Sequence, residues 1–370
     1  MAPIREQQSS PARHWPWLLV AAIATGTLTF LSFPETDATA LAWIALAPLR
    51  LALARQRVYG LAAFCWGSLA GLVANLGGFF WIVHLLVVFG HLPLPLALLL
   101  CLLLCSYQGL VFGLWAWATT FLAHRLRRVR APLLDALTFT AAELLVPFIF
   151  PWYLGCSQYR FLPVAQLAEL TGVAGLSFLL ALASGTLVQL LLPLLVAAEQ
   201  RPARRFLARQ AAATVMLTLA VLAWGSFRLA QVERRMAAAP HLRVAMVEGD
   251  IGIARKARPE HVADNLAVYQ QLSTHAARRG AELIVWPESS YDVRWIHKDT
   301  RHIPPSSLPL GGWEQLLGAA PATATDHLVL PGRRALPPAR QLPAAGQQVS
   351  RCDLVAPQRG FATPLLFGAI

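Results

Sequence analysis

Residues 92–123 read LPLPLALLLCLLLCSYQGLVFGLWAWATTFLA, a run that contains no Asp, Glu, Lys or Arg. A helix needs about 20 mostly apolar residues to cross the hydrocarbon core of a bilayer. The run is long enough for a membrane-spanning helix, and it predicts that the chain lies in a membrane. Cys101 and Cys105 lie inside it, where a thiol behaves as a small apolar group.

The composition of the whole chain also indicates a membrane protein. Of its 370 residues, 56% are hydrophobic and 14% are charged, whereas soluble domains carry about 25% charged residues. Further apolar runs bring the expected number of spans to about seven. The runs are Trp15–Phe33, Thr39–Ala54, Tyr59–Phe89, Leu92–Ala123, Pro132–Phe150, Val164–Ala197 and Ala211–Leu229. We therefore expect a membrane α-helical bundle over residues 1–235.

The net charge of +12 is gathered in arginine clusters between the apolar runs. Because these clusters do not follow one amphipathic face, they favour anionic lipid headgroups over nucleic acid as a partner. They precede the first run and follow the second (Arg50, Arg55, Arg57), the fourth and the sixth, and Arg160 is the exception among the other loops. By the positive-inside rule, the N-terminus is cytoplasmic and everything after Leu229 lies outside, which in a bacterium is the periplasm.

The sequence from His241 onward is typical of a soluble αβ domain. Its expected strands are Leu242–Val247, Leu283–Trp286 and two short runs at 328–330 and 364–370. Residues 259–279 carry apolar side chains at helical spacing, and Gly280 is a suitable helix stop. Pro304–Gln348 is rich in Pro, Ala and Gly and predicts a loop or insertion. The second domain is thus expected over residues 241–370.

The last expected strand ends at Ile370, at the end of the sequence. A domain rarely ends on an unpaired central strand, because backbone groups and an apolar face would be left unsatisfied. We therefore expect the polypeptide to be a fragment or one half of a split protein.

Short motifs occur in both parts of the chain in a definite order. They are LSFP at 31–34, LAPL at 46–49, FPWYLG at 150–155, GLSF at 175–178, VEGD at 247–250 and LIVWPES at 283–289. In this order and spacing they resemble the apolipoprotein N-acyltransferase family, in which membrane spans precede a nitrilase-type (CN hydrolase) domain. The resemblance covers nearly the whole chain and implies a partial αββα nitrilase-like domain after the bundle.

The resemblance also implies a reaction. An acyl chain passes from a phospholipid to a cysteine, and then to the N-terminal amine of a diacylglyceryl-cysteine in an apolipoprotein. The thiol must lose its proton, so a carboxylate serves as general base. Glu288, which leaves an apolar strand after Trp286 and Pro287, matches the base of the family, and apolar surroundings are expected to favour its protonated form. Lys256 matches a lysine on a substrate-binding loop, although Ala257 stands where a tryptophan usually follows. No cofactor or metal is implied.

The nucleophilic cysteine and a second lysine of the family lie further along than Ile370. Lys298 and Cys352 lack the expected neighbours, and neither is assigned a role. Two interpretations stay open: an N-acyltransferase whose Cys and Lys come from a downstream segment or a second chain, and a catalytically inactive split or truncated relative that binds lipid or a partner. A transporter is disfavoured because the spans do not form two matching halves.

Glu143 is an ionisable residue within an expected span. Such a residue is costly in lipid, so it faces the interior of the bundle or a wet cavity. One interpretation makes Glu143 a substrate-binding group, a polar wall on the path of the lipid headgroup. The other makes it a structural residue that is hydrogen-bonded to a neighbouring helix.

Overall fold

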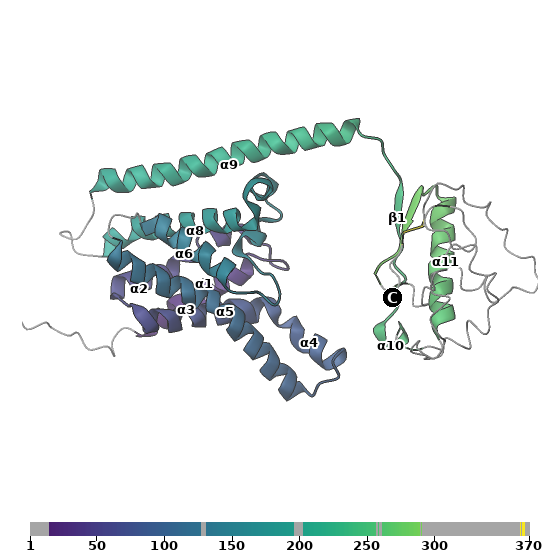
Figure 1. Cartoon of the computed structure of the whole chain (residues 1–370), viewed down its shortest axis with the longest axis horizontal. Coiled ribbons are helices and arrows are strands. Elements are labelled where there is room, and N and C mark those ends of the chain that lie inside the picture. The colour runs from purple at the N-terminus through teal and green to yellow at the C-terminus, as the bar shows by residue number, and fades with distance from the viewer. Residues whose placement is uncertain are drawn as a thin grey trace, which may run out of the picture. The chain divides into compact units, whose positions relative to one another are not determined.

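The computed structural model describes residues 15–126, 131–195, 203–256, 258, 261–288, 290, 363 and 365–366. The chain divides into two compact units, Met1–Ala238 and Ala239–Ile370. The first unit is built from helices, and the second contains a small sheet (Figure 1).

Every expected span of the first unit contains helix. The α-helices are α1 (Trp15–Leu31), α2 (Ala47–Gln56), α3 (Gly60–Phe79), α4 (Trp81–Val88), α5 (Leu94–Arg125), α6 (Ala131–Leu145), α7 (Leu162–Ala165), α8 (Ala168–Leu195) and α9 (Arg204–Ala238), with 3₁₀ turns η2 (Thr39–Trp43) and η3 (Leu154–Gln158). Within the described residues, α3, α5, α8 and α9 contain stretches long and apolar enough to cross a membrane, and α1 is a shorter apolar helix. The helices of this unit fit the predicted membrane region.

Three of the expected spans are not single straight helices. Thr39–Ala54 divides into η2 and the 10-residue α2, which has Pro48 in its first turn, where a proline is tolerated. At about 1.5 Å per residue, α2 rises about 15 Å, half of the hydrocarbon thickness, so this span is not one continuous helix. Tyr59–Phe89 divides at Phe80 into α3 and α4. The helix α8 is kinked at Gly172, where φ is 66° and ψ is −174°.

Helices α3 and α5 approach each other closely through glycines. A Cβ atom at Gly71 would overlap the backbone of Gly109, and one at Gly67 would overlap the carbonyl oxygen of Phe112. In a membrane, small residues let two backbones come close enough for extensive van der Waals contact. These glycines therefore fix the distance between the two helices.

Replacing Gly71 by alanine should not stabilise the bundle, although alanine is the better helix former. Helix propensity alone would favour Ala over Gly by about 1 kcal/mol. The added methyl group must push α3 away from Gly109, and overpacking of this kind costs about 1–3 kcal/mol. The free energy of unfolding in bicelles, measured against SDS, should therefore fall or stay level rather than rise. Leu76→Ala, on the exposed face of α3, is the control, and a clear rise for Gly71→Ala would contradict the close approach.

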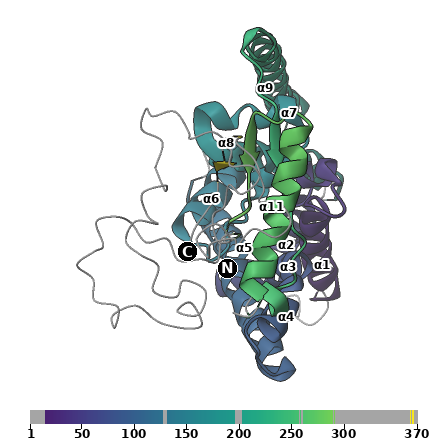
Figure 2. The same cartoon turned by 90° about the vertical axis from the view of Figure 1, so that its right-hand side faces the viewer.

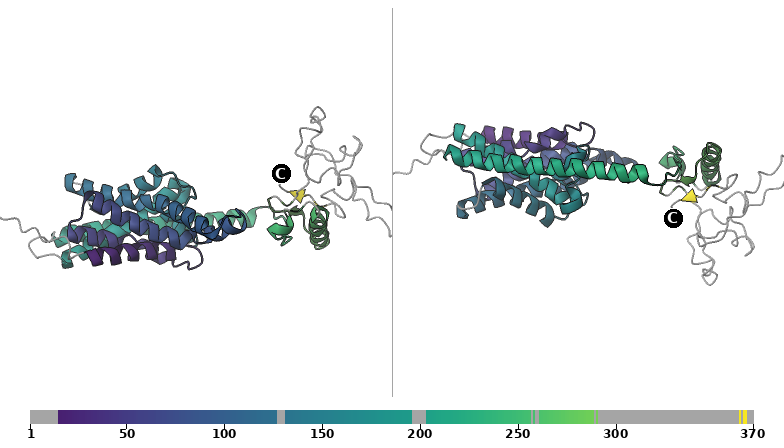
Figure 3. Two further views of the ribbon diagram at one scale, coloured as in Figure 1. Left: turned by 90° about the horizontal axis from the view of Figure 1, so that it is seen from below. Right: turned by 90° about the horizontal axis from the view of Figure 1, so that it is seen from above.

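Helix α9 runs along the outside of the bundle, beside α7 and α8 (Figures 2 and 3). Gly225 packs directly against the carbonyl oxygen of Pro163 in α7. Further along, Arg228 donates from Nε and Nη2 to the two carboxylate oxygens of Glu169 in α8, at 2.5 and 2.6 Å. A forked guanidinium–carboxylate pair fixes orientation as well as distance, so it ties this part of α9 to α8.

The second unit contains a parallel sheet in the order β1-β2-β3. Its described elements are β1 (Val244–Met246), α10 (Ile253–Lys256), α11 (Val262–Arg278), β2 (Leu283–Val285) and β3 (Leu365–Leu366). The amphipathic α11 packs Val262, Leu266 and Tyr269 against Ile284 and Trp286 of the β2 segment. This burial holds helix and sheet together.

The expected strands at 242–247 and 283–286 and the helix at 259–279 therefore occur, as β1, β2 and α11. The helix ends before Gly280, whose φ of 85° suits a glycine. Part of the run at 364–370 forms β3. The strand expected at 328–330 and the insertion at 304–348 lie outside the described residues, as do Lys298 and Cys352.

Candidate functional site

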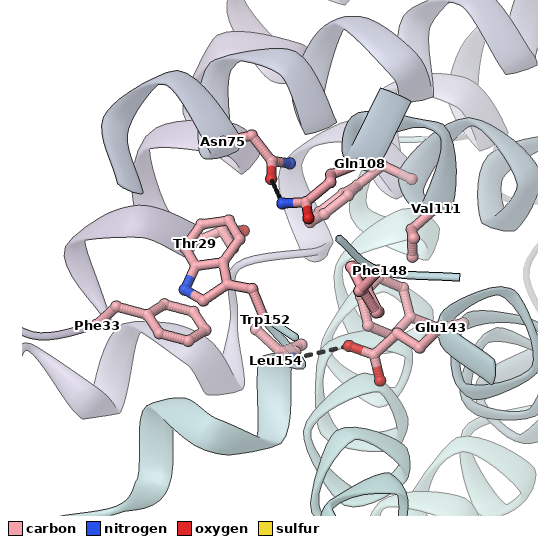
Figure 4. A pocket seen from close by; sticks show the side chains of 11 residues that line it. Thr29, Phe33, Asn75, Gln108, Val111, Glu143, Phe148, Trp152 and Leu154 are labelled. Atoms are coloured by element: carbon pink, nitrogen blue, oxygen red, sulfur yellow. Dashed lines mark hydrogen bonds between the residues drawn. The ribbon is translucent and has the colours of Figure 1, made fainter. Parts of the chain in front are cut away.

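Glu143 lies in the interior of the bundle, near the C-terminal end of α6, and is only 3% exposed. Its Oε1 accepts a hydrogen bond from the backbone N–H of Leu154 at 2.7 Å (Figure 4). Ser177 of α8 accepts from the next N–H, that of Gly155, at 2.9 Å. The first N–H groups of a helical turn have no partner inside the turn. Glu143 and Ser177 supply partners for η3, which follows the FPW motif.

The other end of η3 is tied to the loop after α1. The amide of Gln158, which is fully buried, donates to the carbonyl oxygen of Thr39 at 3.0 Å and accepts from the indole N–H of Trp43 at 3.1 Å. Next to it, the hydroxyl of Tyr159 donates to Asp37, and this hydrogen bond raises the pKa of the tyrosine. Two loops that are distant in sequence are thus joined at one end of the bundle.

A small cavity of about 10 Å³ lies between Glu143 and the FPW motif (Figure 4). The ring of Trp152 is part of its lining and lies 4.4 Å from Phe33 and 5.4 Å from Phe79, measured between ring centroids. Sites for small molecules measure about 300–1,000 Å³, so a lipid headgroup does not fit here. The hydrogen bond from Leu154 agrees with the structural interpretation of Glu143. Its interpretation as a substrate-binding wall of a lipid path stays a prediction.

A buried ion pair joins α2 to α6. The Nε of Arg50 lies 2.6 Å from Oδ1 of Asp135, and both side chains are more than nine-tenths buried. The sequence pattern places Arg50 with the loop arginines, but it lies inside α2 and faces the bundle. Arg55 and Arg57 remain as the charges that follow α2. Spacing along the chain gives no sign of this pair, because its partners are 85 residues apart.

Glu288 and Lys256 follow two neighbouring strands of the sheet in the second unit. Strands β1 and β2 are parallel, so the segments that leave their carboxyl ends begin at the same edge. Glu288 lies three residues after β2 and is exposed, and Lys256, at the end of α10 after β1, is half-buried. Among the described residues, Glu288 does not have the apolar surroundings that its sequence predicts. The strand β3 also reaches this edge with its carboxyl end.

Comparison with known proteins identifies the family. Residues 25–186 match the apolipoprotein N-acyltransferase N-terminal domain. The apolipoprotein N-acyltransferase of Geobacter metallireducens is 34% identical over 276 residues, which are 73% of this chain and 50% of that protein. Proteins of the same name from Azotobacter vinelandii and Pseudomonas putida are 35% and 33% identical, over 75% of this chain and 52% and 53% of their own lengths. The chain belongs to the apolipoprotein N-acyltransferase family.

These relatives are named as acyltransferases, so the chain resembles an enzyme. The chain spans about half the length of the curated relatives it matches. The matched N-terminal domain runs from α1 into α8 and includes Glu143 and the Arg50–Asp135 pair, but it ends before Lys256 and Glu288. Roles for Lys256 and Glu288 therefore depend on the sequence motifs and on the edge of the sheet.

Proposed function

We propose that this family member acts in lipoprotein maturation, by transferring a fatty acyl chain from a phospholipid to the N-terminal amine of diacylglyceryl-cysteine in apolipoproteins. The observation that carries the proposal is the match to named apolipoprotein N-acyltransferases over about three quarters of the chain. The apolar helices support a location in the membrane, where both substrates are found because both carry lipid chains.

In the proposed reaction, a cysteine thiolate attacks an ester carbonyl of the phospholipid, and a lysophospholipid leaves. The amine of the lipoprotein then attacks the thioester and releases the thiol. Glu288 is the proposed base that takes the thiol proton, and its open position at the edge of the sheet leaves the carboxylate accessible. Lys256, from the neighbouring strand, is the proposed substrate-binding residue. Neither the nucleophile nor the second lysine is assigned to a residue, and the named relatives do not support a second chain that supplies them.

The nitrilase-like character of the second unit is part of the same proposal. Its support is a parallel sheet in which β2 leads into the WPE sequence, with α11 packed on the sheet. Because the described strands are few, the sheet is compatible with a nitrilase-like domain but also with other αβ folds. Glu143 is proposed to hold η3 behind the FPW motif and to act on the substrate only through that turn.

The proposed location is the bacterial inner membrane, with about seven crossings and the second unit in the periplasm. In this proposal η2 and α2 together make the second crossing. Contacts inside the bundle agree with such an antiparallel order: Gln158 and Thr39 meet at one end, and Glu169 meets Arg228 near the same end. The C-terminal ends of α2 and α5, with Arg55 and Arg125, belong to the opposite end.

Reporter fusions test this topology. A reporter that is active only in the periplasm should be active when fused at Gly280 and inactive when fused at Arg128. The physical reason is the arginine excess after α2, α5 and α8, which opposes export of these loops. Activity on the same side for both fusions would rule out the proposed arrangement.

Complementation tests the reaction. In a bacterium whose own apolipoprotein N-acyltransferase is depleted, the native gene of this protein should restore growth. Mass spectrometry of a lipoprotein N-terminal peptide should then show one additional fatty acyl group on the amine. The protein must be detected in the membrane fraction as a control. A peptide that stays diacylated while the protein is present in the membrane would oppose the proposed transfer.

A further inference from the structure

We propose that Ser273 is a positioning residue for Glu288, and that it acts through a hydrogen bond to Trp286. The inference rests on the proposed role of Glu288 as general base. Ser273 lies in α11, and Trp286 directly follows β2. The indole N–H of Trp286 donates to Oγ of Ser273 at 2.8 Å.

Both partners of this bond are buried, with exposed fractions of 3% for Trp286 and 0% for Ser273. A buried indole N–H requires an acceptor, because it can no longer bond to water. The ring of Tyr269, one helical turn before Ser273, lies 5.1 Å from the indole, measured between ring centroids. Apolar packing is not directional and would allow several orientations of the ring, whereas the hydrogen bond selects one orientation of the indole.

The main chain carries this constraint from Trp286 to Glu288. The backbone N–H of Trp286 donates to the carbonyl oxygen of Leu366 in β3 at 3.0 Å, so its backbone is anchored as well. The next residue, Pro287, has a fixed φ, and a residue that precedes proline has a restricted backbone. On the far side, the N–H of Ser290 donates to the carbonyl oxygen of Pro287 at 3.3 Å and closes a turn around Glu288. Few free dihedral angles therefore separate the anchored indole from the carboxylate.

A general base is sensitive to small displacements, because it must reach the proton that it removes. Loss of the Ser273 hydroxyl would leave the indole N–H without this acceptor and free the ring to turn. The turn at Pro287–Ser290 would move with it. Ser273 therefore affects the reaction without touching the substrate.

The test uses protein produced from the native gene, placed in liposomes, and four variants. Ser273→Ala removes the acceptor, Trp286→Phe removes the donor, and the double variant removes both. Thr274→Ala is the matched control, because Thr274 is the next residue of α11 and its hydroxyl bonds to the carbonyl oxygen of Gln270 in the same helix. Two assays are run on the folded protein. The first gives kcat and KM for acyl transfer from labelled phospholipid, and the second gives the pH dependence of carbodiimide labelling at Glu288, read by peptide mass spectrometry.

Ser273→Ala should lower kcat at least about tenfold with little change in KM, since a misplacement of about 1 Å can cost about a hundredfold. It should also shift the pH dependence of labelling at Glu288, and the double variant should be no worse than either single variant. Labelling in Ser273→Ala that matches Thr274→Ala would overturn the proposal. If Glu288→Gln keeps the full transfer rate, the proposed base is wrong, and the labelling still decides whether Ser273 positions the carboxylate.

Discussion

Glu288→Gln should slow acyl transfer by about a hundredfold to ten-thousandfold, the usual contribution of a well-placed general base. Glutamine keeps the size and shape of the side chain but cannot take the thiol proton. The side chain is exposed after β2 and is not part of the packed core, so the protein should remain folded in the membrane. The measurement is the rate of transfer from labelled phospholipid per folded molecule, in protein produced from the native gene.

Glu282→Gln is the matched control for this substitution. Glu282 precedes β2 at the opposite edge of the sheet, where its Oε2 accepts from the backbone N–H of Arg243 at 2.8 Å. An amide oxygen can also accept that hydrogen bond, so this variant should keep the rate of the unmodified protein. Equal rates for Glu288→Gln and Glu282→Gln would remove Glu288 from the mechanism and leave the family match as a statement about fold.

The helices of the bundle could be predicted because the apolar runs are longer than those that helices of soluble proteins require. Their ends were less predictable, because they depend on local backbone chemistry. Thr39–Ala54 is apolar enough to suggest a span, yet it forms a 3₁₀ turn and a short helix with a proline in its first turn. Hydropathy measures how well a segment suits an apolar environment, and it does not show whether the chain turns within that segment. Strands β1 and β2 were predictable because both lie in short apolar runs that contain β-branched residues.

The candidate site also has a part that the sequence could predict and a part that it could not. Glu288 could be proposed from the WPE sequence, since the motif is local. The partner of Glu143 could not, because it is a backbone N–H at Leu154 that any residue would present. The bond between Ser273 and Trp286 joins side chains 13 residues apart on a helix and a strand. A single serine on α11 gives no signal until the two elements are packed together.

Asp135→Leu and Arg50→Met should each destabilise the bundle by about 3–5 kcal/mol, the usual cost of removing one partner of a buried ion pair. The remaining charge would lie in the bundle without the counter-ion that now sits 2.6 Å away. Exposure of the two side chains is only 8% and 3%, so solvent can screen little of that charge. Unfolding in bicelles, followed against SDS, measures the loss, and Glu169→Gln, whose side chain is 45% exposed, serves as the comparison for a surface ion pair.

The double variant Arg50→Met and Asp135→Leu separates the pair from the packing. Replacing both charges by apolar side chains of similar volume removes the cost of taking ions out of water, and such replacements are often neutral or stabilising. The double variant should therefore be more stable than either single variant, with a coupling of at least about 1 kcal/mol between the two sites. Additive losses would mean that the guanidinium and the carboxylate act separately, and that α2 and α6 are held together by their apolar contacts alone.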